Sequence, residues 1–309
     1  MKAIRVHQFG GPEVLKYEDA PRPVPAADEV LIKVYASGMN PVDWKMRAGL
    51  AESLFPIQLP FIPGWDVSGE IEEVGSDILI FKKGDEVYGR PDVTRDGTYA
   101  EYVAVKANQI NFKPKSINHD KASAVPLAGL TAWQGLFDYG HLEEGQKVLI
   151  HAAAGGVGSF AVQLAKWKGA YVIGTSSEEN IDFLFDLGAD EALDYKTVKF
   201  EDRLKDVDLV FDLIGGDTQQ RSLKIIKKGG RLITTVQPKY QEEAKANDIH
   251  MEVFMTQSLP EELEQLGNLI DSGKIKPIVT RTFPLKDAAE AQKEIEKGHT
   301  RGKMVLTVV

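Results

Sequence analysis

The feature that most constrains the fold is a glycine-rich turn, His151-Ala152-Ala153-Ala154-Gly155-Gly156-Val157-Gly158, which lies between two apolar segments. The segment before it, 147–152, has the length and apolar content of a buried strand. The segment after it places apolar side chains on one helical face, at Val157, Ala161, Leu164 and Ala165. A strand, a tight turn and a helix in this order predict a βαβ unit in a parallel sheet.

The spacing of the glycines predicts that a dinucleotide binds at this turn. The absence of a side chain at Gly155 lets the backbone approach a pyrophosphate, and Gly158 permits close packing of the helix on the strand. The helix start, with Gly156 and Val157, offers free N–H groups and a positive dipole end to the phosphates. The pattern departs from G-x-G-x-x-G because Ala153 replaces the first glycine. The alternative is a tight turn with a structural role only.

The rest of the chain divides into segments of different character. Residues 1–120 contain short strand-like runs separated by Gly and Pro, which is typical of a barrel-like β domain. Strand-like and helix-like segments then alternate through the middle of the chain. From about Pro277 the β character returns, with strand candidates at 279–283 and 303–308. The prediction is an α/β protein with a doubly wound parallel sheet inserted into a β domain.

Composition excludes several classes of function. The 309 residues include no cysteine, which rules out disulfides, Cys-ligated zinc, iron–sulfur clusters and a thiol nucleophile. The net charge of −9 makes general binding of nucleic acids a poor expectation. No apolar run approaches the length of about 18 residues that spans a bilayer, and no secretory signal is visible at the N-terminus. We therefore expect no membrane insertion and a cytoplasmic location.

The end of the second strand of the parallel sheet bears on the choice of cofactor. A fold of this type that selects NAD places an acid there, about 20 residues after the glycines. Here the sequence is Gly174-Thr175-Ser176-Ser177-Glu178. The hydroxyls of Ser176 and Ser177 leave room for a 2′-phosphate and can donate to it, which favours NADPH. The alternative is that these serines only cap the next helix. Glu178 would repel a phosphate if it pointed inward.

Taken in order, several stretches make the whole chain similar to one family. They are Gly10–Leu15, Pro21–Pro25, Ala36–Asp43, Pro63–Gly69, Gly129–Trp133, the glycine turn and Phe211–Gly216. The chain resembles the zinc-free medium-chain dehydrogenase/reductases, the zeta-crystallin-like NADPH:quinone oxidoreductases. The resemblance implies a GroES-like domain, 1–122 and 277–309, an inserted Rossmann domain, 123–276, and a cofactor in the cleft between them.

The resemblance also bears on metal use. Zinc-dependent relatives have Cys at the position of Asn40 and His at the position of Trp65, and they carry a four-cysteine lobe. Indole cannot ligate zinc, and the span 90–101 is too short for that lobe. No metal site is expected.

The resemblance further implies a set of site residues. Asn40 is the candidate donor to a developing oxyanion, Lys45 and Trp65 are expected to line the same cleft, and Asp43 acts in catalysis or only fixes its loop. The cofactor-binding positions carried over, besides the glycine turn and the two serines, are Asn40, Thr131, Tyr195, Ile214, Gly215 and Lys303. For Thr131 and Tyr195 the alternatives are a core threonine and an ordinary surface aromatic. His151 is expected to pack rather than to transfer protons.

The expected reaction is transfer of a hydride from NADPH to a quinone, without zinc. A first alternative is reduction of the C=C bond of an enal, enone or enoyl thioester. A second, of another class, is an NADPH-binding structural or regulatory protein with little turnover. The expected partner is a small electrophilic acceptor. Residues 250–255 form an edge-strand candidate, and because this region commonly pairs between subunits in the family, a homodimer is also expected.

Overall fold

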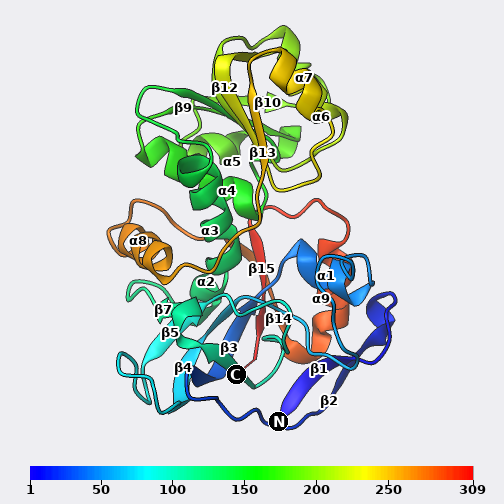
Figure 1. Cartoon of the computed structure of the whole chain (residues 1–309), viewed down its shortest axis with the longest axis vertical. Coiled ribbons are helices and arrows are strands. Elements are labelled where there is room, and N and C mark those ends of the chain that lie inside the picture. The colour runs from blue at the N-terminus through cyan, green and yellow to red at the C-terminus, as the bar shows by residue number, and fades with distance from the viewer. Residues whose placement is uncertain (309) are drawn as a thin grey trace. The chain divides into compact units, whose positions relative to one another are not determined.

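A six-stranded parallel sheet forms the centre of one part of the chain (Figure 1). Its strands are β8 (Lys147–Ile150), β9 (Tyr171–Ser176), β10 (Glu191–Asp194), β11 (Val207–Asp212), β12 (Ile226–Thr234) and β13 (His250–Val253). They lie in the order β10-β9-β8-β11-β12-β13, and every neighbouring pair is parallel. In chain order this is 3-2-1-4-5-6, the arrangement of a Rossmann fold, which confirms the predicted doubly wound sheet.

Four helices connect these strands. They are α4 (Gly156–Trp167), α5 (Ile181–Asp186), α6 (Asp217–Leu223) and α7 (Gln241–Ala246). The central strands are apolar along their length, and Leu149, Ile173 and Val210 lie fully buried in one core cluster. Burial on both faces of the sheet explains why these strands appear in the sequence as continuous apolar runs.

A second sheet is built from both ends of the chain. Its strands are β3 (Glu29–Gly38), β4 (Val67–Val74), β5 (Glu86–Gly89), β6 (Tyr102–Lys106), β7 (Ile110–Phe112), β14 (Val279–Pro284) and β15 (Lys303–Thr307). The order is β14-β15-β3-β4-β5-β7, and β6 pairs with β3. Strands β1 (Lys2–Val6) and β2 (Leu15–Asp19) form a separate antiparallel ladder. This is the predicted GroES-like β domain, in which the C-terminal strand β15 lies beside β3.

The helices that accompany the second sheet are short. They are α1 (Pro41–Arg47), α2 (His119–Ser123), α3 (Pro126–Trp133), α8 (Pro260–Asp271) and α9 (Ala288–Ile295). Single 3₁₀ turns occur at Pro12–Val14, Ala107–Gln109, Glu178–Asn180, Phe200–Asp202 and Leu285–Asp287, and a π-helical turn at Gln134–Asp138. No helix within residues 1–308 combines the length and the apolar character needed to cross a bilayer.

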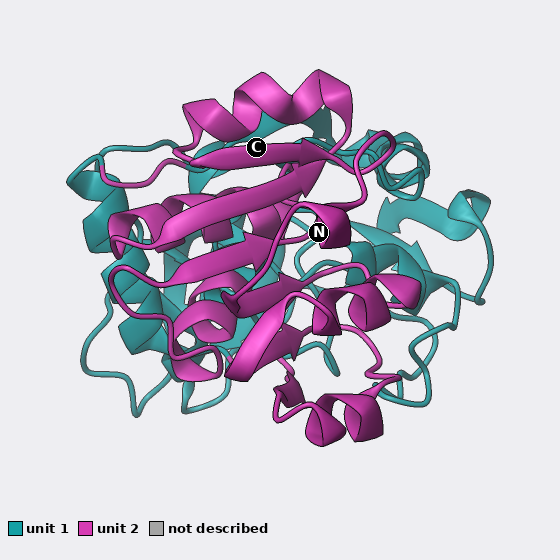
Figure 2. Cartoon of the chain, turned by 90° about the horizontal axis from the view of Figure 1, so that it is seen from above, with its two compact units in different colours: residues 1–130, 258–273, 277–309 teal, residues 131–257, 274–276 magenta. Residues whose placement is uncertain are grey.

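The computed structural model describes residues 1–308, and these divide into two compact units (Figure 2). Unit 1 comprises 1–130, 258–273 and the segment from 277 on, and unit 2 comprises 131–257 and 274–276. The domain limits expected from the sequence stay a prediction, and the compact units differ from them at 123–130 and 258–273.

The reason for the difference at 258–273 is the packing of α8 in unit 1. The Tyr88 hydroxyl donates to the Leu263 carbonyl at 2.5 Å, and the Asn111 amide donates to the Pro260 carbonyl at 2.8 Å. Both donors lie on strands of the second sheet. An amphipathic pattern identifies a helix but not the sheet that it covers.

Strand β13 lies at the edge of the parallel sheet, as expected for residues 250–255. A homodimer formed through this edge and a cytoplasmic location stay predictions.

Candidate active site

Most of the cofactor-binding residues expected from the sequence lie at one edge of the parallel sheet. The carboxyl ends of parallel strands share an edge, and ligands of open α/β sheets bind outside it. The glycine turn follows β8, Ser176 ends β9, Tyr195 follows β10, and Ile214 and Gly215 follow β11. The point at which the strand order reverses lies between β8 and β11. The fold therefore brings these residues of unit 2 to the sheet edge at which the switch point lies.

The two key glycines of the turn differ in the space around them. A Cβ on Gly158 would lie 2.3 Å from the Ala152 carbonyl oxygen and 2.6 Å from the Ala153 Cα. A Cβ on Gly155, the residue that caps α4, would meet only the Ala152 oxygen, at 3.3 Å. Gly158 is therefore required for packing, while Gly155 leaves the helix start accessible. The roles inferred from the sequence fit this geometry.

The ends of β9 and β10 bring the expected ribose-binding residues together. The Tyr195 N–H donates to the Ser176 carbonyl at 3.1 Å, and the Ser176 hydroxyl donates to the Ser177 carbonyl at 3.1 Å. The Tyr195 side chain is 52% exposed. Lys196 lies next to it, with Nζ 5.9 Å from the centroid of the Tyr195 ring. A cation is thus present beside the Tyr195 ring, and Glu178 is exposed.

The buried His151 side chain connects β9 and α6 near this edge through two hydrogen bonds. Its Nδ1 lies 3.0 Å from the Thr175 hydroxyl, and its Nε2 lies 2.9 Å from the Ser222 hydroxyl, which itself donates to the Thr218 carbonyl. Ser222 therefore accepts from Nε2–H. Burial lowers the pKa of His151 to about 4, against the nearby Asp212 carboxylate, which raises it. The imidazole is neutral at physiological pH and packs, as expected.

Asp212 orders the loop after β11. Its carboxylate accepts from the N–H groups of Ile214 and Gly215, each at 3.0 Å, and from the side chains of Gln219 and Thr234. A carboxylate with this many donors is held firmly in place. Asp212, which was not among the expected site residues, therefore fixes the positions of Ile214 and Gly215.

Thr131 is buried at the start of unit 2. Its hydroxyl lies 2.7 Å from that of Thr256, three residues after the end of β13. This places Thr131 at the carboxyl end of the last strand of the same sheet. Its expected role at the nicotinamide stays a prediction.

A second cluster lies in unit 1, at one end of the antiparallel sheet. The β15–β3 register pairs Val305 with Gly38, so that Lys303 and Asn40 face each other just beyond β3. Lys303 Nζ donates to Asn40 Oδ1 at 2.5 Å and to the Met39 carbonyl at 2.7 Å, and it lies 3.3 Å from Asp66 Oδ2. Asn40 and Lys303 are each 4% exposed. Every N–H of this ammonium is engaged within the protein, so its expected contact with a cofactor stays a prediction that the geometry does not favour.

Asn40 has one firm and one weak donor contact. Its amide nitrogen donates to Asp66 Oδ2 at 2.8 Å and faces the Gly38 carbonyl at 3.4 Å. The latter distance is long for a hydrogen bond. The second amide N–H is therefore the one that an acceptor oxygen could take over.

Two buried carboxylates surround Asn40. Burial raises the pKa of Asp66, opposed by Lys303 and by the Asn40 amide. Burial also raises the pKa of Asp43 to about 7, opposed by hydrogen bonds from the Asn40 backbone N–H and the Tyr99 hydroxyl, both at 2.7 Å. Asp43 closes a capping box at the start of α1. This geometry fits the loop-fixing role considered for Asp43.

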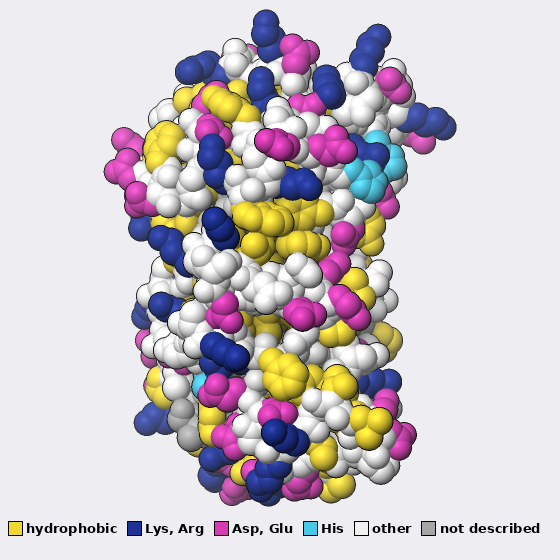
Figure 3. Space-filling view, turned by 90° about the vertical axis from the view of Figure 1, so that its left-hand side faces the viewer, with side chains coloured by type: hydrophobic (Ala, Val, Ile, Leu, Met, Phe, Trp, Pro, Cys, Tyr) yellow, Lys and Arg dark blue, Asp and Glu magenta, His cyan; other side chains and the backbone are white. Residues whose placement is uncertain are grey.

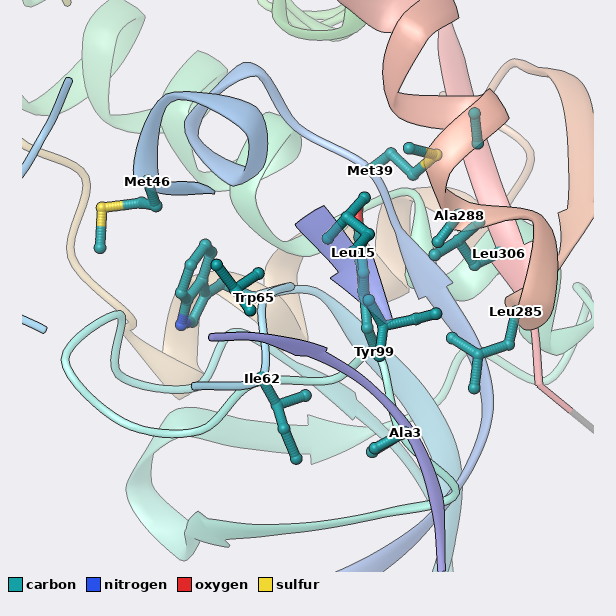
Figure 4. Close-up of a cluster of buried hydrophobic side chains, with 14 of the residues drawn as sticks. Ala3, Leu15, Met39, Met46, Ile62, Trp65, Tyr99, Leu285, Ala288 and Leu306 are labelled. Carbon is teal, nitrogen blue, oxygen red and sulfur yellow. The ribbon is translucent and has the colours of Figure 1, made fainter. Parts of the chain in front are cut away.

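Trp65 and Lys45 lie apart from this cluster. Trp65 is completely buried among the core residues around Met46 and Ile62 (Figure 4), and its Nε1 has no hydrogen-bond partner among residues 1–308. A side chain without exposed surface cannot line a cleft, so the structure differs here from the expectation. Lys45 is exposed on α1, with Nζ 5.8 Å from the centroid of the Trp44 ring.

Sequence reasoning assigned no role to Asp66, Tyr99, Arg90, Asp212 or Lys196. For Asp66 a signal existed, since an acid between Trp65 and Val67 interrupts an apolar stretch. Tyr99 and Arg90 depend on contacts between distant segments, which no local pattern reports. Asp212 and Lys196, in contrast, lie close in the chain to the residues they contact.

Within residues 1–308 there is no group of three His, Cys, Asp or Glu side chains arranged to hold a metal ion. On the face drawn in Figure 3, Lys and Arg side chains are interspersed with Asp and Glu side chains. That pattern differs from the basic stripe that a nucleic-acid-binding face presents.

Two family models match the chain. The alcohol dehydrogenase GroES-like domain matches residues 26–115, and the zinc-binding dehydrogenase model matches residues 187–306. Among curated relatives, the quinone oxidoreductase of Mus musculus is 36% identical, over 99% of this chain and 97% of its own length. The mitochondrial NAD(P)H oxidoreductase RTN4IP1 of Danio rerio is 31% identical, over 100% of this chain and 92% of its own length.

The chain is also similar in fold to several solved structures. The quinone oxidoreductase of Coxiella burnetii has a TM-score of 0.94 and 38% identity, with 100% of this chain and 99% of that chain covered. The Escherichia coli quinone oxidoreductase complexed with NADPH has a TM-score of 0.91 and 30% identity, with both chains fully covered. The CurK enoyl reductase has a TM-score of 0.90 and 27% identity, with 99% and 98% covered.

These similarities extend over essentially the full length of each protein compared. They agree with the parallel sheet of Rossmann order and with the GroES-like sheet. The chain belongs to the zinc-free quinone oxidoreductase family of the medium-chain dehydrogenase/reductases.

Proposed function

We propose that the protein reduces quinones with NADPH by hydride transfer, without a metal ion. The observation that carries the proposal is the edge of the parallel sheet, where the glycine turn, two serines in place of an acid, and Tyr195 with Lys196 lie together. The NADPH bound by the Escherichia coli relative agrees with this choice of cofactor. Quinone, NADPH and a proton would give hydroquinone and NADP⁺.

The residues of unit 2 fit such a cofactor. The start of α4 offers N–H groups to the pyrophosphate, and Gly155 leaves room for its approach. Ser176 and Ser177 would hold the 2′-phosphate, with Lys196 supplying positive charge. When bound, NADPH supplies the hydride, and the protein provides orientation and electrostatics.

We expect Ser176→Asp to reverse the preference for NADPH. The added carboxylate would repel the 2′-phosphate and accept from a free 2′-hydroxyl. The expected loss in kcat/KM for NADPH is about tenfold or more, with a smaller change for NADH. Steady-state kinetics with both cofactors measure it. Ser76→Asp, which adds the same charge at an exposed position in unit 1, should change neither value, and an equal loss for both cofactors would contradict the assignment.

In unit 1, Asn40 is the proposed donor to the acceptor. Hydride addition makes an oxyanion or enolate, which a preorganised N–H group stabilises. Lys303 and Asp66 fix the plane of the Asn40 amide from both ends. The long contact to the Gly38 carbonyl leaves one amide hydrogen for the acceptor. The final proton would come from solvent.

We expect Asn40→Ala to lower kcat/KM for a quinone by about a hundredfold, because the donor to the developing charge is lost. Asn118→Ala is a matched control, since Asn118 also caps a helix of unit 1 and accepts from the Lys121 N–H. Asn118→Ala should lose about 1 kcal/mol of stability through its lost cap. Asn40→Ala should lose more, because the buried Lys303 and Asp66 side chains also lose a hydrogen-bond partner. Parallel losses of activity in both variants, measured beside urea unfolding, would show that Asn40 is only a cap.

A second candidate function is reduction of an activated C=C bond. It is favoured by the similarity to an enoyl reductase. The same cofactor and the same donor would serve, since hydride addition to an enone or enoyl thioester also places negative charge on oxygen.

The experiment that tests the proposal is NADPH oxidation by the EDTA-treated protein with a small para-quinone, with NADH run in parallel. Fast oxidation of NADPH by the quinone, without oxidation of NADH, supports both the reaction and the role of Ser176. Fast oxidation of NADH instead contradicts the cofactor assignment. Oxidation only with an enone favours C=C reduction. Binding of NADPH without any turnover would favour the structural or regulatory role.

A further inference from the structure

Arg90 lies at the same end of the antiparallel sheet as Asn40, Asp66 and Lys303. The β4–β5 register pairs Val67 with Gly89, which places Asp66 and Arg90 opposite each other at the next position. The neighbouring strands β15 and β3 bring Lys303 and Asn40 to this end. Four neighbouring strands thus bring a polar or charged residue to the same end of the sheet.

The guanidinium of Arg90 is poorly compensated. Its Nη1 donates to the Ser258 hydroxyl at 2.9 Å, and that hydroxyl donates back to the Arg90 carbonyl at 2.8 Å. Its Nε is buried without an acceptor. Among residues 1–308, its Nη2 has no hydrogen-bond acceptor and no carboxylate forms an ion pair with the guanidinium. Burial lowers the pKa of Arg90, opposed by the Asp66 and Asp92 carboxylates.

Arg47, in the same unit, provides a comparison, because acceptors within the protein satisfy its guanidinium nitrogens. Its Nε donates to the Gly10 carbonyl, its Nη1 to Gln292, and its Nη2 pairs with Glu296. All three nitrogens have acceptors, and the side chain is almost fully buried. Arg90 has one partner, a neutral hydroxyl, and is only half-buried.

Asp66 and Asp92 act on Arg90 only through space, without a direct ion pair. A half-buried cation without such a pair carries a desolvation cost that a bound oxyanion would offset. Arginine is also the side chain best suited to carboxylates, sulfonates and phosphates. The phosphates of the cofactor are assigned to unit 2, whereas Arg90 lies at the same end of the antiparallel sheet as the proposed donor, Asn40. We propose that Arg90 binds an anionic group of the acceptor, so that the preferred substrates are quinones or enones that carry an oxyanion.

This inference rests on the proposed function, and the test separates the two. The probes are 1,2-naphthoquinone-4-sulfonate and 1,2-naphthoquinone, with 3-benzoylacrylate and its ethyl ester as a carboxylate pair. Wild-type protein should have a lower KM for each anionic probe. Arg90→Gln should raise the KM for the anionic probes by about tenfold or more and leave the neutral ones within about twofold. Arg90→Lys, which keeps the charge, should show a smaller increase.

Arg203→Gln is the matched control, since Arg203 is exposed in unit 2 and its loss changes the net charge equally. It should leave every KM unchanged. Equal increases for anionic and neutral probes in Arg90→Gln would mean a structural role, and an increase in the KM for NADPH with all acceptors would mean a cofactor contact. Either result, or no change, would overturn the proposal.

A binding measurement tests the anion site even if the protein does not reduce quinones. If wild-type protein reduces none of the four probes, calorimetry with the sulfonate and NADP⁺-loaded protein still decides. Binding that is lost in Arg90→Gln and kept in Arg203→Gln supports the anion site. Equal binding by both variants contradicts it.

Discussion

Replacement of Gly158 by alanine should destabilise unit 2 and abolish binding of NADPH. The new Cβ would lie 2.3 Å from the Ala152 oxygen and 2.6 Å from the Ala153 Cα. Both atoms belong to the backbone of the turn, so no side-chain rotation can relieve the overlap. Overpacking of this kind costs about 3 kcal/mol, and α4 would have to move away from β8. Urea unfolding and the fluorescence change on NADPH titration measure the two effects.

The Gly155→Ala variant should affect the binding of NADPH but hardly the stability of the protein. Its Cβ would meet only one backbone oxygen, at 3.3 Å, so the variant should stay within about 1 kcal/mol of wild-type stability. Its methyl group would nevertheless occupy space needed for the pyrophosphate, and the Kd for NADPH should rise by about tenfold or more. Wild-type stability of Gly158→Ala, or unchanged affinity of Gly155→Ala, would contradict the geometry described for this turn.

Replacement of Lys303 by methionine should strongly lower both the stability of the protein and its activity. The variant leaves Asp66 buried without its cation and Asn40 without its partner. Breaking a buried ion pair by removing one member costs about 3–5 kcal/mol. Because the Asn40 amide would lose its fixed orientation, kcat/KM for a quinone should fall as well. Lys303 is thus proposed as a positioning residue.

The loss in Lys303→Met should depend on pH. Burial already raises the pKa of Asp66 above its usual value, and Lys303 opposes that rise. Without the ammonium the pKa rises further, so the folded variant binds a proton that the unfolded chain has released. Stability relative to wild type therefore falls as pH rises. Urea unfolding near pH 8 should show the full loss, and unfolding near pH 5 a smaller one.

Two further variants make this prediction specific. Lys303→Met combined with Asp66→Asn removes both charges, and it should recover more than half of the lost stability. Lys45→Met removes an exposed lysine of the same unit and should stay within about 0.5 kcal/mol of wild type. A stability of Lys303→Met equal to that of wild type near pH 8 would show that the pair contributes nothing.

The fold could be predicted largely because its signals are local. Buried parallel strands such as β8, β9 and β11 appear as short apolar runs, and the glycine turn marks the first βα connection. Residues that follow such strands, Ser176, Tyr195 and Ile214 among them, necessarily reach one edge of the sheet. Their convergence therefore followed from topology alone.

The cluster in unit 1 could not be predicted in the same way. Lys303 and Asn40 are separated by 263 positions, and only the pairing of β15 with β3 brings them together. The sequence also cannot report that Trp65 is enclosed in the core or that every N–H of Lys303 is used. The placement of 258–273 in unit 1 depends on which surface the buried face of α8 packs against, and the periodicity of the helix does not encode that choice.

The measurement that tests the central claim most directly is a single-turnover reaction under metal-free, anaerobic conditions. Protein loaded with NADPH, unlabelled or carrying deuterium at the transferred C4 position, is mixed with a para-quinone, and the loss of NADPH is followed beside hydroquinone formation. One hydroquinone should form per NADPH, and the deuterated cofactor should be oxidised more slowly. No oxidation, or oxidation that begins only when a metal ion is added, would contradict it.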